Sequence, residues 1–155
     1  MTTTPASPHL LQDEAAIASL LARTRRIAVL GIKTEAQAGQ PAFDVARYLD
    51  AAGFEVVPVP VYYPDVTSIL GKPVYRRLVD IPGDIDLVDV FRRPRDIDAH
   101  VDDLLAKRPR AVWFQLGIRN DAAADRLAAA GIDVVQDRCL KVEHRRWAAM
   151  VAAAR

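Results

Sequence analysis

Unbroken apolar runs are the feature of this sequence that most restricts its fold. The clearest, RIAVLGI at 26–32, shows no alternation of polar and apolar positions. Further strand-like segments follow at 54–61, 86–91, 111–115 and 132–135. A strand that is apolar all round must be covered on both faces, as the strands of parallel sheets are. The runs therefore predict a parallel sheet with helices packed on either side of it.

Segments with helical character alternate with these strands. They lie at 10–24, 41–52, 96–107, 120–130 and 140–154. The segment at 62–82 is irregular, and we expect a short strand near Val74 and Tyr75 and a helical turn near Leu78. Short connections and right-handed crossovers predict an α/β, Rossmann-like, doubly wound and mostly parallel sheet with helices on both faces. Such sheets bind ligands beyond the carboxyl ends of their strands, where the strand order reverses.

Length, charge and cysteine content narrow the function classes. The 155 residues fit one domain, which we expect at 10–155 after a disordered leader at 1–9. A formal net charge of +1 gives no overall attraction to nucleic acid or to an anionic membrane. The single cysteine, Cys139, excludes an internal disulfide and indicates a reducing compartment. We therefore expect a cytoplasmic protein that binds a small molecule, with no nucleic-acid or membrane partner.

The ends of the predicted strands distinguish between nucleotide cofactors. The loop after the first strand contains only Gly31 and Gly39, so it lacks the G-x-G-x-x-G turn of dinucleotide-binding domains. The second strand ends at 59–62 without the acidic residue that usually binds the ribose of NAD. Arg92 and Arg93 follow the strand at 86–91, and paired guanidinium groups suit a phosphate. This pattern favours coenzyme A (CoA), with NADP as the alternative.

Residues 26–144 resemble the small stand-alone CoA-binding proteins, whose domain is similar to the CoA-binding domain of succinyl-CoA synthetase alpha subunits. The matching stretches are RIAVLGI (26–32), QPAFDVARYL (40–49), GFEVVPV (53–59), LGKPVY (70–75), DIDLVDVFRRP (84–94), VWFQLG (112–117) and DRCLKVEH (137–144). The resemblance implies that the pyrophosphate of CoA lies on the 31–43 loop and the helix start that follows. It also implies that the adenosine part lies between the ends of the second strand and of the strand at 86–91.

Strand-end position and this resemblance together give the expected binding residues. These are Gly31, Ile32, Lys33, Thr34, Gln40, Pro41, Ala42, Pro60, Phe91, Arg92, Arg93, Gln115 and Gly117. Relatives often carry an arginine and a hydroxyl where this chain has Gln40 and Ala42. Lys33 offers a replacement charge in the same loop.

We expect the other reactive side chains to have structural roles. We expect Cys139 to be a buried thiol, Asp137 to cap the last helix, and His144 to be structural or exposed. Trp113 and Phe114 read as core. One cysteine and three histidines at separate places predict no metal cluster, and no catalytic residue is expected.

Three functions remain open at this point. The favoured one is a CoA-binding module without chemistry of its own, as a homodimer or with a partner subunit. The second is an enzyme, either an NADP-type oxidoreductase or a subunit related to acyl-CoA ligases. The third is a scaffold that has kept the fold and lost its ligand, which the residues at 40 and 42 suggest.

Overall fold

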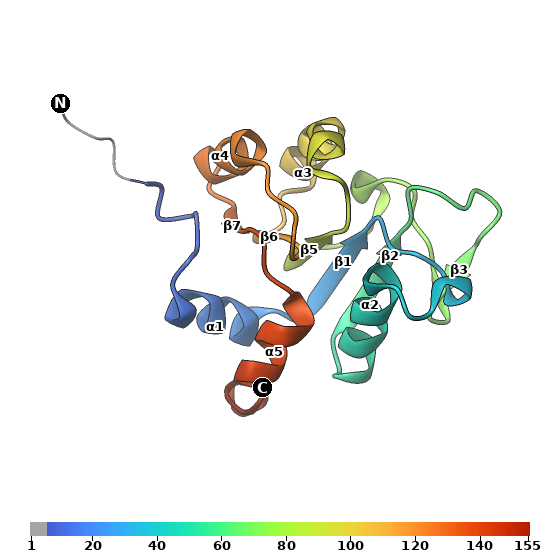
Figure 1. Cartoon of the computed structure of the whole chain (residues 1–155), viewed down its shortest axis with the longest axis horizontal. Coiled ribbons are helices and arrows are strands. Elements are labelled where there is room, and N and C mark those ends of the chain that lie inside the picture. Colours follow the sequence, from blue (N-terminus) through green and yellow to red (C-terminus); the bar gives the residue numbers. More distant parts are fainter. Residues whose placement is uncertain (1–5) are drawn as a thin grey trace.

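The computed structural model describes residues 6–155 and has one central sheet (Figure 1). Its five strands are all parallel and lie in the order β2-β1-β5-β6-β7. They span Arg26–Leu30 (β1), Glu55–Val59 (β2), Leu87–Val90 (β5), Ala111–Phe114 (β6) and Asp133–Val135 (β7). Strand order reverses between β1 and β5, which is the switch point of a doubly wound sheet. The predicted Rossmann-like fold is confirmed.

Helices cover both faces of this sheet. They are α1 (Glu14–Arg23), α2 (Pro41–Ala51), α3 (Val101–Lys107), α4 (Asp121–Ala129) and α5 (Leu140–Ala153). In Figure 1, α1, α2 and α5 lie on one side of the strands, and α3 and α4 lie on the other. Two buried clusters follow from this layering, because alternate side chains of each strand enter opposite cores.

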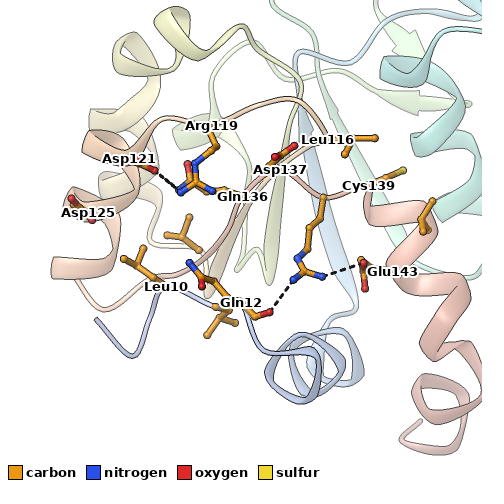
Figure 2. A pocket seen from close by; sticks show the side chains of 14 residues that line it. Leu10, Gln12, Leu116, Arg119, Asp121, Asp125, Gln136, Asp137, Cys139 and Glu143 are labelled. Carbon is orange, nitrogen blue, oxygen red and sulfur yellow. Dashed lines mark hydrogen bonds and ion pairs between the residues drawn. The ribbon is translucent and has the colours of Figure 1, made fainter. Parts of the chain in front are cut away.

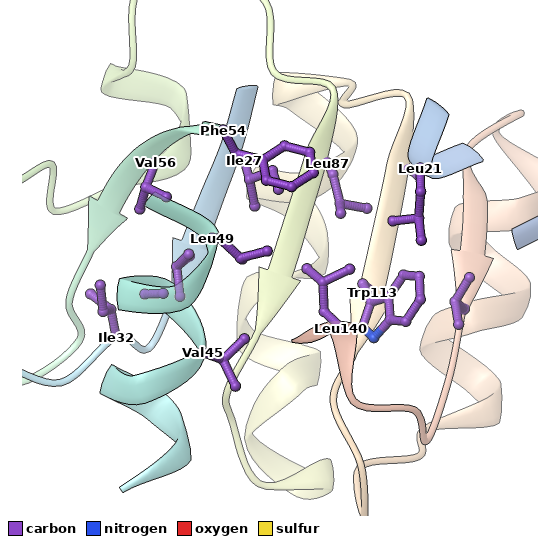
Figure 3. Close-up of a cluster of buried hydrophobic side chains, with 14 of the residues drawn as sticks. Leu21, Ile27, Ile32, Val45, Leu49, Phe54, Val56, Leu87, Trp113 and Leu140 are labelled. Carbon is purple, nitrogen blue, oxygen red and sulfur yellow. The ribbon is translucent and has the colours of Figure 1, made fainter. Parts of the chain in front are cut away.

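The first cluster packs α1, α2 and α5 against the sheet (Figure 3). Leu21 of α1, Leu49 of α2, Leu140 of α5 and Trp113 of β6 all belong to this cluster, and each is almost fully buried. The second cluster packs α3 and α4 against the other face and includes Phe114. Trp113 and Phe114 are therefore core residues, as the sequence predicted.

The connection between β2 and β5 is the least regular part of the fold. It holds the two-residue strands β3 (Ser68–Ile69) and β4 (Lys72–Pro73), which pair antiparallel, and a 3-10 turn η2 (Leu78–Asp80). The helical turn near Leu78 is confirmed, and the short strand lies just before Val74 rather than at it. The Tyr75 N–H donates to the Pro58 carbonyl at 3.0 Å, which ties this connection to β2.

Two predicted helices begin later than expected. The predicted first helix starts at Glu14, because the Asp13 carboxylate caps it and Leu10 instead makes a parallel bridge to Val134 of β7. The predicted helix at 96–107 is a 3-10 helix, η3 (Pro94–His100), followed by α3. Within the predicted leader, residues 1–5 lie outside the described residues, and His9 contacts Asp133 at 2.7 Å between Nδ1 and Oδ1.

Candidate functional site

The carboxyl ends of β1 and β5 approach each other very closely at the switch point. Gly31 follows β1 with φ +84°, and its N–H donates to the Val59 carbonyl at 2.9 Å. The Phe91 N–H donates to the Leu30 carbonyl at 2.9 Å, which extends the β1–β5 pairing to the strand exits. A Cβ at Gly31 would lie 2.3 Å from the Phe91 carbonyl oxygen. The glycine therefore serves packing between the two exits, and it does not line the cleft described below.

The loop after β1 brings a cation and a helix start to the same place. Lys33 Nζ donates to Gln40 Oε1 at 2.5 Å, and the Lys33 N–H donates to the Ala42 carbonyl at 3.0 Å. Pro41 opens α2 and has no N–H, while those of Phe43 and Asp44 donate to the Gln40 carbonyl. In the described part of the chain this leaves the Ala42 N–H of the first turn for a ligand. Helix N-termini of this kind favour anions.

Two arginines face this loop from the end of β5. The Arg92 side chain is 14% exposed, and its Nε donates to His100 Nε2 at 3.2 Å. Its guanidinium also lies over the Tyr62 ring, 5.5 Å from the centroid. Arg93 is more exposed, and its Nε donates to Asp96 Oδ2 at 2.7 Å. Arg92 is thus held in place on several sides, whereas Arg93 is tethered at one point.

The contacts of the two arginines change the pKa values of the groups around them. The hydrogen bond from Arg93 holds the pKa of the Asp96 carboxyl below its usual value. Burial, with the nearby Arg92 charge, lowers the pKa of His100. A neutral His100 can accept from Arg92 through Nε2, whereas a protonated one cannot. The hydrogen bond from Arg92 likewise lowers the pKa of Tyr62.

These elements enclose a cleft of about 530 Å³, a volume usual for ligand sites. Its walls are Lys33, Gln40, Pro41, Ala42, Tyr62, Phe91, Arg92, Arg93, Pro94, Gly117 and Ile118. The lining contains three cationic side chains and no carboxylate, imidazole, thiol or serine. It is therefore suited to bind an anion and offers no general base of those types.

Eight predicted binding residues line this cleft, and five do not. The eight are Lys33, Gln40, Pro41, Ala42, Phe91, Arg92, Arg93 and Gly117. The five that lie elsewhere are Gly31, Ile32, Thr34, Pro60 and Gln115.

Besides Gly31, which is explained by the close approach to Phe91, the other four have structural reasons for their positions. Ile32 and Pro60 are buried, like the strand ends to which they belong. Thr34 caps the short 3-10 helix η1 (Glu35–Gln37), in which it and Gln37 form a capping box. Gln115 is 3% exposed and donates through Nε2 to Asp89 Oδ1 at 2.6 Å. Local hydrogen bonds and core packing thus occupy the side chains of these residues.

Three cleft residues were missed from the sequence: Tyr62, Pro94 and Ile118. Tyr62 belongs to the predicted strand-end segment at 59–62, and this position was the signal available in the sequence. Ile118 follows Gly117, and its N–H donates to the Gln115 carbonyl at 2.8 Å in the tight turn after β6. The turn after β6 places Ile118 at the cleft. The position of Ile118 relative to the strand end therefore did not predict that it lines the cleft.

A larger cavity, of about 800 Å³, lies farther along the same edge of the sheet (Figure 2). It is bordered by the segments that follow β6 and β7, by the start of α5, and by Leu10, Leu11 and Gln12. Its cations are largely paired: Arg119 with Asp121 at 2.9 Å, and Arg138 with the Gln12 carbonyl at 2.9 Å. Despite its size, it therefore suits a polyanion less well than the smaller cleft does.

The remaining reactive residues are engaged in structure. Asp137 does not cap α5, because its carboxylate accepts from the Gly117 N–H at 2.6 Å; the residue at the cap position is Cys139, which is half-buried. His144 is buried, with Nδ1 2.7 Å from the Tyr48 hydroxyl, which confirms its structural role. Among residues 6–155, no cluster of His, Cys, Asp or Glu is arranged to hold a metal ion. No helix of this part of the chain is long and apolar enough to cross a membrane.

Comparisons with known proteins agree with this architecture. The uncharacterized protein YneT of Bacillus subtilis is 32% identical over 132 residues, covering 85% of this chain and 94% of that protein. A solved structure from Thermus thermophilus, cell-free ID.343, has a TM-score of 0.80 and 37% identity, covering 88% of this chain and 99% of that one.

A larger enzyme shares the fold. The dinucleotide-forming acetyl-coenzyme A synthetase 1 of Ca. Korarchaeum cryptofilum has a TM-score of 0.58 at 18% identity, covering 70% of this chain and 25% of that one. At this identity the likeness concerns the fold alone. A family model for the CoA binding domain matches residues 25–145, which span the whole sheet and the cleft. This chain therefore belongs to the CoA-binding domain family.

Proposed function

We propose that this protein binds coenzyme A, free or acylated, in the cleft at the β1–β5 switch point. The observation that carries the proposal is the convergence of Lys33, Arg92 and Arg93 on one cleft at the start of α2. Phosphate groups need charge-assisted hydrogen bonds, and guanidinium groups supply them with directional geometry. CoA carries a pyrophosphate and a 3′-phosphate, so it can use both the helix start and the arginine pair.

The two phosphate groups are assigned to different walls. The pyrophosphate lies against Lys33 and the Ala42 N–H, where the helix dipole adds a favourable potential. The 3′-phosphate lies at Arg92 and Arg93, and the adenine ring packs near Tyr62 and Phe91. The exposed Tyr62 ring supports this arrangement, because a purine can stack on an aromatic face.

We further propose that binding is not followed by turnover. The lining of the phosphate cleft supports this, since it offers no carboxylate, imidazole or thiol to move a proton. In the larger cavity beside it, Asp137 is held by the Gly117 N–H, and Glu143 is paired with Arg138 and Arg146. The single cysteine supports a cytoplasmic location.

Isothermal titration with CoA, NADP, NAD and ATP tests the proposal. We expect CoA to bind with the highest affinity, because it alone combines a pyrophosphate, a 3′-phosphate and a long neutral arm. No heat with CoA at millimolar concentration, from folded protein, would overturn the proposal. A stronger signal from NADP would favour the oxidoreductase interpretation.

A further inference from the structure

The larger cavity and the phosphate cleft lie along one edge of the sheet. The cleft is at the exits of β1 and β5, and the cavity is at the exits of β6 and β7. A single wall, the turn after β6, separates the two. Gly117 and Ile118 of this turn line the cleft, while Leu116 and Arg119 line the cavity.

This wall is low and firmly held. Gly117 has no side chain, and a Cβ there would meet nothing within 4 Å. Its N–H donates to the Asp137 carboxylate at 2.6 Å, and the Asp137 N–H donates to the Ile118 carbonyl at 3.2 Å. A slender chain can therefore pass over Gly117 without displacing a side chain.

The cavity presents apolar side chains to an incoming chain. Leu116 is 69% exposed and Val142 is 52% exposed, although both are aliphatic. Leu10 and Leu11, both half-buried, add apolar surface from the N-terminal segment. In Figure 2, Leu116 lies on the side of the cavity toward α2, and Leu10 lies on the opposite side. A ligand that enters from the cleft thus meets the exposed leucine first.

The charged groups of the cavity select against a second anion. Its lining holds two arginines, Arg119 and Arg138, against four acids, Asp121, Asp125, Asp137 and Glu143, so its formal charge is 2 − 4 = −2. Both arginines already have carboxylate partners, at 2.9 Å for Arg119 and 3.5 Å for Arg138. A carboxylate at the end of an acyl chain would find no free cation among these lining residues.

From these observations we propose that the larger cavity is an acyl-binding site, and that the ligand class is an acyl-CoA with a neutral, apolar acyl chain. This rests on the proposed function, because the phosphates must lie in the cleft for the pantetheine arm to cross at Gly117. The thioester then lies near Leu116, and the acyl chain covers Leu116 and Val142.

Affinities for a series of CoA compounds test the assignment. Free CoA, acetyl-CoA, octanoyl-CoA and succinyl-CoA are titrated into the full chain by calorimetry. Each fully buried methylene strengthens binding roughly fourfold, and the cavity is partly open, so we expect octanoyl-CoA to bind at least about tenfold more tightly than acetyl-CoA. Succinyl-CoA should bind no more tightly than free CoA.

Matched variants test whether the higher affinity for octanoyl-CoA comes from the larger cavity. Leu116→Asn with Val142→Asn should abolish the preference for octanoyl-CoA over acetyl-CoA, and the ratio of the two affinities within the variant is the readout, because Leu116 also lies near the thiol end of CoA. Val79→Asn, at another exposed valine outside both cavities, should keep the preference.

The outcomes separate the two proposals. Equal affinities for octanoyl-CoA, acetyl-CoA and free CoA would overturn the acyl site alone, as would an octanoyl advantage that survives the double variant. Absence of binding by all four compounds would overturn the proposed function and this inference together.

Discussion

Gly31 and Phe91 approach so closely that the Phe91 carbonyl oxygen occupies the space a side chain at residue 31 would need. A Cβ on Gly31 would lie 2.3 Å from that oxygen, well inside van der Waals contact. The backbone of Gly31 also has φ +84°, which is unfavourable for any residue with a side chain. Two independent constraints therefore fix glycine at the switch point.

Gly31→Ala should separate these constraints when it is compared with Gly131→Ala. Gly131 has φ +85° and open space around its Cβ position, so its substitution adds backbone strain without a clash. Strain alone is worth about 1–2 kcal/mol, and overpacking adds about 1–3 kcal/mol. We expect urea unfolding to show a loss of about 1–2 kcal/mol for Gly131→Ala and a clearly larger loss for Gly31→Ala. Equal losses would show that the contact with Phe91 relaxes freely.

Asp89 is an acid inside the sheet, between Val29 of β1 and Trp113 of β6. It is fully buried, Oδ1 accepts from Gln115, and Oδ2 has no partner within residues 6–155. Burial raises the pKa of Asp89 from 3.8 to about 8. The folded protein therefore holds a proton that the unfolded chain releases at neutral pH.

This proton makes stability fall as pH rises. Between the unfolded pKa near 4 and the folded pKa of about 8, the native state binds more protons than the unfolded state, so the unfolding free energy decreases with pH. The slope approaches about 1.4 kcal/mol per pH unit between these two pKa values and flattens above pH 8. Asp89→Asn should remove this pH dependence. The unfolding free energy, measured by urea unfolding between pH 6 and 9, should therefore change less with pH in the variant than in the unmodified protein. Parallel curves for the two proteins would mean that Asp89 is ionised in the native state.

The sheet was predictable because its strands are buried on both faces, and strands of this kind are apolar at nearly every position. The run at 26–32 and the segment at 111–115 could belong to few other structures. The predicted helix at 96–107 is confirmed only from Val101 onward, for a geometric reason. Pro94 starts a tight 3-10 segment that buries Ile97, and over seven residues the periods of 3.0 and 3.6 are hard to distinguish in sequence.

The site was predictable where position on a strand end decides exposure, as for Arg92 and Lys33. Site residues were not predictable where a partner far away in the sequence determines the direction of the side chain. Gln115 turns into the core because Asp89, 26 positions earlier, offers a buried acceptor. Asp137 turns to the Gly117 N–H instead of capping α5, because the β6 turn lies within reach only in the folded chain. Pairings of this kind are set by tertiary contacts, which periodicity and local propensity do not encode.

The arginine pair should distinguish CoA from dephospho-CoA. Replacing Arg92 and Arg93 together by glutamine removes charge-assisted hydrogen bonds, each worth about 1.5–3 kcal/mol, so CoA affinity should fall at least about tenfold. Dephospho-CoA lacks the 3′-phosphate and should lose little. Calorimetry on both ligands measures the difference. The matched control is Arg145→Gln with Arg146→Gln, an exposed adjacent pair on α5 that changes net charge equally.

Equal weakening of CoA and dephospho-CoA by the Arg92 and Arg93 substitutions would show that these residues do not contact the 3′-phosphate. Weakening of CoA by the α5 pair to the same degree would show that only overall charge matters.

Lys33 should show the complementary pattern, because its ammonium group donates to Gln40 at the start of α2, the wall to which the pyrophosphate is assigned. Both CoA and dephospho-CoA carry the pyrophosphate assigned to this wall, so Lys33→Met should weaken the two ligands equally. An exposed ionic contact is worth up to about 1 kcal/mol, which corresponds to a loss of about fivefold. The loss should shrink as salt is raised, since screening already weakens the contact in the unmodified protein. Lys33→Arg should restore most of the affinity. A loss confined to CoA would instead place the 3′-phosphate at Lys33 and reverse the direction of the ligand along the sheet edge.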